Sequence, residues 1–262
     1  MSQLKIGVSL DSMDLPLRQA LSEAARLGVG GVQADARGDL LPDRLTETGR
    51  REFRNLLRGH NLQLTAMGCP LRHGLDVPDG LDARLEHVRR VMALAFDLGA
   101  RLVIVQAGRI PDDLDSPEGS LLRQSLGDLA RHGDRVGTVL ALESGLDSGE
   151  KTKAFLDRFD TGSLGVNYDP ANMLLNGHDP VANLFPLRGW IVHSHAHDAR
   201  RAGASRPAQE VPVGAGDIEW MGYLAALESV EYRGWLVVER ETGTQRLADI
   251  RASVEFLRRF VG

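Results

Sequence analysis

The segment His193-Ser194-His195-Ala196-His197 places histidine at every other position of an apolar run. The chain has 262 residues and eight histidines, and three of those eight are in this segment. Alternate side chains of an extended strand share one face, so the three imidazoles are expected to point the same way. Imidazole is a metal ligand and an acid–base group near neutral pH. This segment is therefore the first candidate for a chemical site.

Acidic residues close three other apolar runs. Glu143 ends the run LALE, Asp169 ends GVNYD, and LVVERE carries Glu239 and Glu241. A charge buried at a strand end costs several kcal/mol unless it is paired or bound to metal. A single acid of this kind is more often a surface charge, but acids and imidazoles closing four successive runs favour a metal site.

The elements that carry these residues alternate along the whole chain. Helical periodicity fills segments such as 16–27 and 85–98, and Gly28, Gly59 and Gly99 follow helices as C-terminal glycines do. The apolar, strand-like runs are 4–10, 29–35, 62–68, 101–107, 138–144, 163–169, 190–197 and 234–241. Eight strands alternating with helices in a chain of this length predict an α/β fold, a (β/α)8 TIM barrel, as one domain over residues 1–262.

An open, doubly wound sheet is the second choice of fold. It is less favoured because the first strand–helix turn, SLDSMDLP, has no glycine-rich phosphate fingerprint. In a barrel, side chains at the carboxyl ends of the strands meet in the active site. The acids and imidazoles would then lie together.

Composition excludes several classes of function. The net charge of −5 argues against a nucleic-acid partner, and no apolar run reaches the roughly 18 residues that span a membrane. No signal-peptide pattern opens the sequence and Cys69 is its single cysteine, so a cytoplasmic protein is expected; a homo-oligomer is compatible with the sequence. Lys5, Lys151 and Lys153 are the only lysines, and none is placed for Schiff-base chemistry at the active end of a strand.

The sequence resembles the sugar phosphate isomerase/epimerase superfamily, also called the xylose isomerase-like TIM barrels or AP endonuclease family 2. Ketose 3-epimerases, inosose and dehydroshikimate dehydratases and endonuclease IV belong to it. The resemblance spans essentially the whole chain, and its order and spacing are more specific than any single motif. It rests on LALESG, GVNYDPANML, IVHSHAHDAR, VPVGAGDIEW and GWLVVERE.

This resemblance implies a ligand set and two catalytic glutamates. The metal ligands would be Glu143, Asp169, His195 and Glu239, of which Glu143 and Glu239 would also exchange the proton. An oxygen-rich set of this kind suits one divalent ion, with Mn²⁺ favoured and Mg²⁺, Co²⁺ and Zn²⁺ as alternatives. The family pattern His-x-Lys-Asp appears here as HAHD, with His197 in the lysine position.

The activity implied is isomerisation or epimerisation of a sugar or keto-sugar, a small carbohydrate. A proton next to the carbonyl would leave and the metal would stabilise the enediolate. The alternative is a lyase, an inosose- or dehydroshikimate-type dehydratase on the same metal site. A nuclease like endonuclease IV is less favoured, because Asn172 and Gln106 stand where its further metal-binding histidines would be. A barrel that binds but does not catalyse is a third alternative.

Substrate contacts are predicted for residues near the strand ends: His197, Asn172, Gln106, Arg200 and Arg201. Asn172 could instead cap the turn after Asp169, and the two arginines could be solvated. His193 and Glu241 are expected to support the ligands from behind. Residues 199–210 are expected to form a mobile loop over the site. The glycines of VGAGD precede a helix predicted to begin near Asp217, and they could bind a phosphate or serve only the turn.

Overall fold

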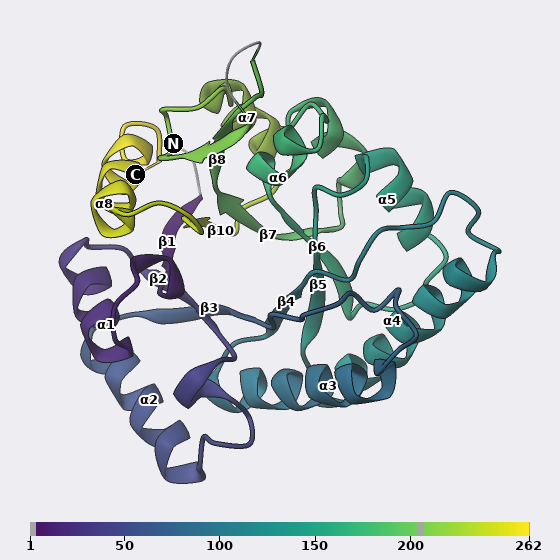
Figure 1. The fold of residues 1–262 in the computed structure, drawn as a ribbon. Coiled ribbons are helices and arrows are strands. Elements are labelled where there is room, and N and C mark those ends of the chain that lie inside the picture. The colour runs from purple at the N-terminus through teal and green to yellow at the C-terminus, as the bar shows by residue number, and fades with distance from the viewer. Residues whose placement is uncertain (1–3, 204–206, 262) are drawn as a thin grey trace.

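In the computed structural model, which describes residues 4–203 and 207–261, eight parallel strands close into a barrel with helices around it (Figure 1). The strands are β1 (Lys5–Ser9), β2 (Gly31–Asp35), β3 (Gln63–Gly68), β4 (Leu102–Val105), β5 (Val139–Glu143), β6 (Leu164–Tyr168), β7 (Ile191–Ala196) and β10 (Trp235–Val238). Each pairs with the next in chain order, and β10 pairs with β1. The predicted (β/α)8 barrel is confirmed, and the alternative prediction of an open, doubly wound sheet is wrong.

Helices follow the strands and cover the outside of the barrel. They are α1 (Leu17–Arg26), α2 (Glu47–Gly59), α3 (Leu81–Leu98), α4 (Pro117–Val136), α5 (Gly149–Leu156), α6 (Pro170–Leu175), α7 (Trp220–Ser229) and α8 (Arg246–Leu257). Short 3-10 turns lie at η1 (Asp11–Met13), η2 (Gly38–Leu40) and η3 (Ala182–Leu187). Among the described residues, no helix combines the length and apolarity needed to cross a bilayer.

Two of the three predicted helix-ending glycines have the expected backbone. Gly28 and Gly99 have φ of 64° and 94°, a left-handed conformation that glycine adopts without strain. The prediction for Gly59 is wrong, because this residue is still helical and Asn61, two residues later, takes the left-handed conformation with φ of 55°. Asparagine tolerates that region better than most residues do.

Strand register brings the polar residues of the barrel to one end. Glu143 on β5 is level with Asn167 on β6, Asn167 is level with His193 on β7, and His195 is level with Val237 on β10. Because parallel strands all end on the same side, the acids that follow β6 and β10 lie beside the imidazoles of β7.

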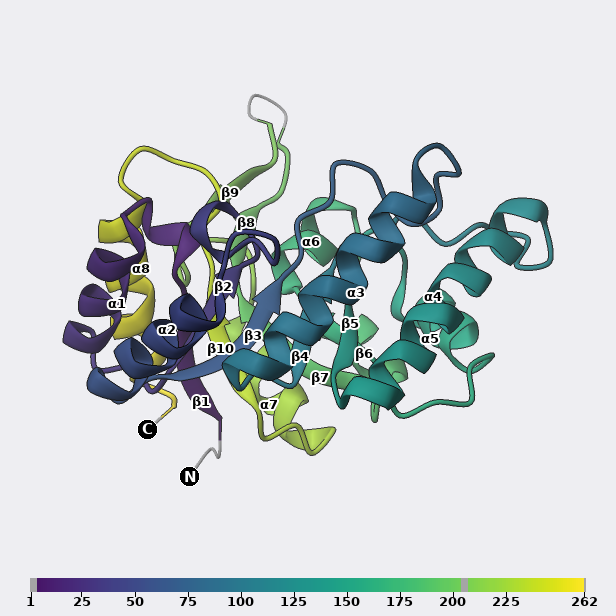
Figure 2. The same cartoon turned by 90° about the horizontal axis from the view of Figure 1, so that it is seen from below.

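A two-stranded antiparallel hairpin lies outside the barrel, between β7 and α7. Its strands are β8 (Asp198–Arg200) and β9 (Gln209–Val211), and Figure 2 shows them on the opposite side of the barrel from the start of β1. The segment 199–210, predicted to be a mobile loop over the site, is therefore paired by backbone hydrogen bonds at both ends, and its mobility stays a prediction. Residues 204–206, in the middle of that segment, lie outside the described residues.

Candidate metal centre

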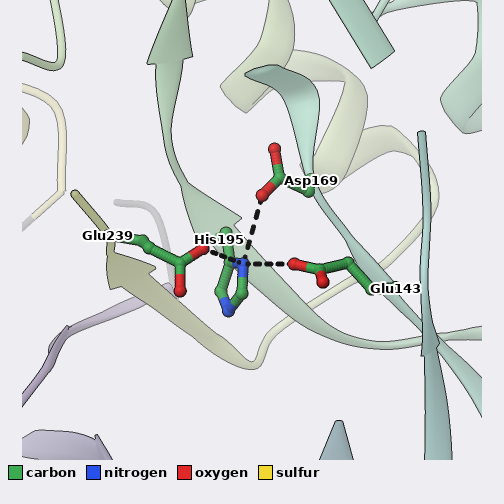
Figure 3. Close-up of side chains that lie close together, drawn as sticks. All are labelled: Glu143, Asp169, His195 and Glu239. Carbon is green, nitrogen blue, oxygen red and sulfur yellow. Dashed lines mark hydrogen bonds and ion pairs between the residues drawn. The ribbon is translucent and has the colours of Figure 1, made fainter. Parts of the chain in front are cut away.

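Four side chains converge at the carboxyl ends of β5, β6, β7 and β10. Figure 3 shows Glu143, Asp169 and Glu239 directed at the imidazole of His195 from three sides. His195 Nδ1 lies 2.8 Å from Glu239 Oε2, 3.2 Å from Asp169 Oδ2 and 3.4 Å from Glu143 Oε1. One ligand atom from each residue lies within 4.8 Å of all the others. These are the four residues that the sequence analysis named as ligands.

Backbone and side-chain contacts hold the acids in place. Glu239 N–H donates to the carbonyl oxygen of Ala196, next to His195, at 3.1 Å. Asp169 N–H donates to Ser144 Oγ at 2.9 Å, which ties the end of β6 to the residue after Glu143. Asp169 also begins α6, since its Oδ1 accepts from Asn172 N–H at 2.8 Å while Oδ2 faces the cluster. The ligand is therefore fixed by the helix that it caps.

The cluster holds more negative charge than its own donors neutralise. A single N–H of His195 cannot donate to three carboxylates at once, and the buried Glu239 Oε2 makes no regular hydrogen bond. Burial raises the pKa of Glu143; burial also opposes the charge of Asp169, but His197 and His195 hold the pKa of that carboxyl well below its usual range. Buried charges of one sign require a counter-charge.

A divalent cation fits this donor set. Ions with metal–oxygen and metal–nitrogen distances of about 2.0–2.4 Å place opposite ligands up to about 4.8 Å apart. Three carboxylates and one imidazole make a hard, oxygen-rich set. Glu143, Asp169, His195 and Glu239 would hold the ion, which would also satisfy the orphaned Glu239 oxygen.

Gln33, on β2, orients the imidazole. His195 Nε2 lies 2.9 Å from Gln33 Oε1, so a proton on Nε2 leaves Nδ1 free to face the carboxylates. The sequence analysis missed Gln33, although an amide inside the apolar run VGGVQAD was a usable signal. Its partner lies on a strand 162 residues away, which the run alone could not reveal.

His193 lies deeper in the barrel, where a supporting role was predicted. It is buried, its Nδ1 lies 2.9 Å from Asn167 Oδ1, and its ring packs edge-on against His195 with centroids 5.6 Å apart. Its Nε2 has no hydrogen-bond partner. This arrangement suits a neutral ring that orders Asn167 and His195.

His197, for which a substrate contact was predicted, is enclosed by protein. It is 1% exposed, with Nδ1 3.0 Å from Asp169 Oδ2 and Nε2 3.0 Å from Glu210 Oε1. Burial opposes protonation of this ring, but Asp169 and Glu210 raise its pKa well above the usual value. A ring held between two carboxylates and closed off from the cavity is better placed to position Asp169 than to contact substrate.

A cavity of about 180 Å³ opens beside the three acids and the imidazole, on the side of β2, β3 and β4. The residues that line it are Gln33, Asp35, Arg37, Gly68, Cys69, Pro70, Leu71, Ile104, Gln106, Glu143, His195, Glu239 and Glu241. Gln106 thus lies where a substrate contact was predicted. Glu241 was expected behind the ligands but lines the cavity, where partial desolvation of its carboxyl and the charge of Glu239 raise its pKa to about 7.

The other predicted contacts lie away from this cavity. Arg200 is exposed and donates from Nε to the carbonyl oxygen of Ala215, and Arg201 is exposed on the hairpin. Asn172 lies in the first turn of α6, where its backbone N–H donates to Asp169 Oδ1, so the cap is Asp169 and the alternative prediction that Asn172 caps this turn is wrong. Asp35 and Arg37, an ion pair joined at 2.7 Å, line the cavity instead and were not predicted from the sequence.

The glycines of VGAGD are committed to the protein itself. The N–H groups of Gly214 and Gly216 donate to Asp198 Oδ2 at 2.8 and 3.1 Å. The prediction of a helix start near Asp217 is wrong, because α7 begins at Trp220 and Glu219 caps it, accepting from the N–H of Gly222 at 2.6 Å. Carboxylates already fill the places that a phosphate would take.

A closed parallel barrel with acids and imidazole converging at its carboxyl end is the architecture of a barrel enzyme. The family model described as "Xylose isomerase-like TIM barrel" matches residues 21–260, and the chain belongs to this family.

Named relatives and solved structures agree with this assignment. The chain is 29% identical to a rhizopine catabolism protein, MocC, of Rhizobium meliloti, over 87% of this chain and 75% of that one. It is 27% identical to an inosose dehydratase of Lacticaseibacillus casei, over 45% and 44% of the two chains. A xylose isomerase domain protein from Planctomyces limnophilus superposes with a TM-score of 0.87 at 27% identity, over 97% and 96%. A D-tagatose 3-epimerase-like protein shares the fold, with a TM-score of 0.81 at 19% identity, over 98% and 96%.

Proposed function

We propose that this protein is a divalent-metal-dependent isomerase or epimerase that acts on a sugar or keto-sugar by abstracting a proton next to a carbonyl. The observation that carries the proposal is the convergence of Glu143 and Glu239 on His195 and Asp169 beside a cavity of about 180 Å³. The family's members include sugar epimerases and dehydratases, which supports the class of substrate.

The positions of the two glutamates support a role in moving the proton. Figure 3 shows their carboxylates reaching His195 from opposite sides, so a substrate bound between them would present one face to each. Glu143 or Glu239 would take the proton from the carbon next to the carbonyl, and the other would return one to the opposite face. A divalent ion, Mn²⁺ most readily, would polarise the carbonyl and stabilise the negative charge left by the proton.

A lyase is the second candidate, because several of the matching relatives are named inosose dehydratase. The first step would be the same, and a hydroxyl on the next carbon would then leave as water. That departure needs an acid in the cavity. Glu241 lines the cavity and meets this need better than the enclosed His197 does.

Deuterium exchange tests the proposal. The protein loaded with Mn²⁺ would be incubated in D₂O with a panel of ketoses, keto-glycosides and keto-inositols, and NMR would follow the carbon next to the carbonyl. We expect exchange with at least one compound, and a loss on the order of 10²- to 10⁴-fold in Glu143→Gln and Glu239→Gln. Growth of an enone absorbance would identify the lyase.

The matched control is Glu219→Gln, an acid-to-amide change at the exposed start of α7. This variant should keep the wild-type exchange rate. Absence of exchange with every compound, in protein shown to hold Mn²⁺, would sink the proposed function.

A further inference from the structure

We propose that Glu210, on the hairpin strand β9, is a positioning residue that sets the geometry of two metal ligands, Asp169 and Glu239. The inference rests on the proposed metal centre. It assigns a role to an element that is not part of the barrel, since β9 pairs with β8 alone.

The Glu210 carboxylate joins three segments of the chain. Its Oε1 lies 3.0 Å from His197 Nε2 and accepts from Glu241 N–H at 2.7 Å. Its Oε2 accepts from both the N–H and the hydroxyl of Thr242 and lies 2.8 Å from Arg240 NH1. The side chain is 6% exposed, so water does not replace these partners. Both oxygens are thereby fixed in direction as well as in place.

One arm of this network leads to Asp169. His197 stands between the two carboxylates, with Nδ1 toward Asp169 Oδ2 and Nε2 toward Glu210 Oε1, each at 3.0 Å. The contact at Nδ1 is a hydrogen bond and the contact at Nε2 is an ion pair without regular hydrogen-bond geometry; together they hold the imidazole between the two acids, and the imidazole holds the Asp169 oxygen that faces the centre. Histidine bridges two acids only if a second acid is supplied, and Glu210 supplies it.

The other arm leads to the segment after Glu239. Glu210 accepts from the N–H groups of the residues two and three positions beyond this ligand. Arg240 lies between Glu239 and Glu241. Its N–H donates to Ser12 Oγ at 3.0 Å and its guanidinium donates to Asp249 Oδ2 at 2.9 Å. These contacts hold the backbone that leaves Glu239, and Glu210 provides two of them.

A purely structural role makes a different prediction. An anchor for the hairpin would lower the free energy of unfolding and leave the affinity of the folded protein for metal unchanged. A positioning residue changes that affinity, because misplaced ligands bind more weakly even when the fold persists. The metal affinity of the folded protein is therefore the deciding measurement.

The experiment titrates Mn²⁺ alone into metal-free wild type, Glu210→Gln, His197→Gln and the double variant by calorimetry, with Glu219→Gln as the matched control. We expect the Kd for Mn²⁺ to rise about 10- to 100-fold in each single variant. The double variant should lose no more than the larger single loss, because both changes interrupt one chain of contacts. The control should keep the wild-type Kd.

Unchanged affinity in a folded Glu210→Gln variant would overturn the proposal, as would losses that add in the double variant. If Glu210→Gln does not fold, His197→Gln alone decides, and an unchanged Kd there overturns it. The two proposals can fail separately. Wild-type protein that binds Mn²⁺ but exchanges no deuterium would contradict the proposed reaction, and the titration would still test the role of Glu210.

Discussion

Two aspartates, Asp169 and Asp198, are completely buried at the same end of the barrel, and their surroundings differ in kind. Asp198 is surrounded by neutral donors, among them the N–H groups of Gly214 and Gly216 and Trp220 Nε1 at 2.9 Å. Asp169 meets two imidazoles and lies in one cluster with Glu143 and Glu239. A buried carboxylate whose oxygens accept hydrogen bonds from neutral donors stabilises the fold. Several carboxylates that converge on one point leave negative charge uncompensated, and a bound cation can compensate it.

The largest expected effect comes from Asp169→Asn. Asparagine keeps an oxygen to cap α6, so the fold should survive, but the ligand loses its charge. The Kd for Mn²⁺ should rise by more than the roughly 100-fold that loss of an outer partner costs. Calorimetric titration measures it. Wild-type affinity in this variant would remove Asp169 from the ligand set.

The same change at Asp198 should act on stability alone. In Asp198→Asn an amide NH₂ replaces an acceptor among buried donors, and the free energy of unfolding should fall by about 2–4 kcal/mol. Urea denaturation in EDTA gives the change, and the Kd for Mn²⁺ of the folded variant should match wild type. A large loss of metal affinity here would erase the contrast between the two aspartates.

Asp35 is intermediate between the two cases, since it is paired with Arg37 but lies against Asp11. Burial and the Asp11 charge raise its pKa to about 7 from 3.8. Because the folded pKa is the higher one, the unfolded chain ionises first, and metal-free protein should lose stability as the pH rises from about 4 to about 7. Asp35→Asn should remove this loss, gaining about 1–3 kcal/mol at pH 8 relative to pH 4 in urea denaturation. Parallel pH profiles for variant and wild type would contradict it.

The smallest effect is expected from Glu219→Ala, which removes the exposed side chain that caps α7. The free energy of unfolding should fall by about 1 kcal/mol. Thermal unfolding of the metal-free protein should detect it, and the Kd for Mn²⁺ should stay as in wild type. A change in that Kd would show that the outer helices influence the centre.

Local patterns predicted the barrel and the acids and imidazoles at its strand ends, and the family resemblance then selected the four ligands among them. Alternating apolar residues define strands, and Glu143, Asp169, His195 and Glu239 stand directly at the ends of such runs. The sequence placed His197 wrongly because β7 ends at Ala196 and the chain then turns into the hairpin. Gln33 and Glu210 were missed because their roles depend on partners on distant strands, which no local period encodes.

The hairpin has a consequence for how such a protein can diversify. It is an insertion between the seventh barrel strand and its helix, and it begins and ends in residues that pair with each other, Asp198 with Val211. A segment anchored in this way can be exchanged between relatives as a unit without disturbing the eight strands. Under our proposal Glu210 would travel with it, so recombination at a surface insertion could retune a buried centre whose own ligands never mutate.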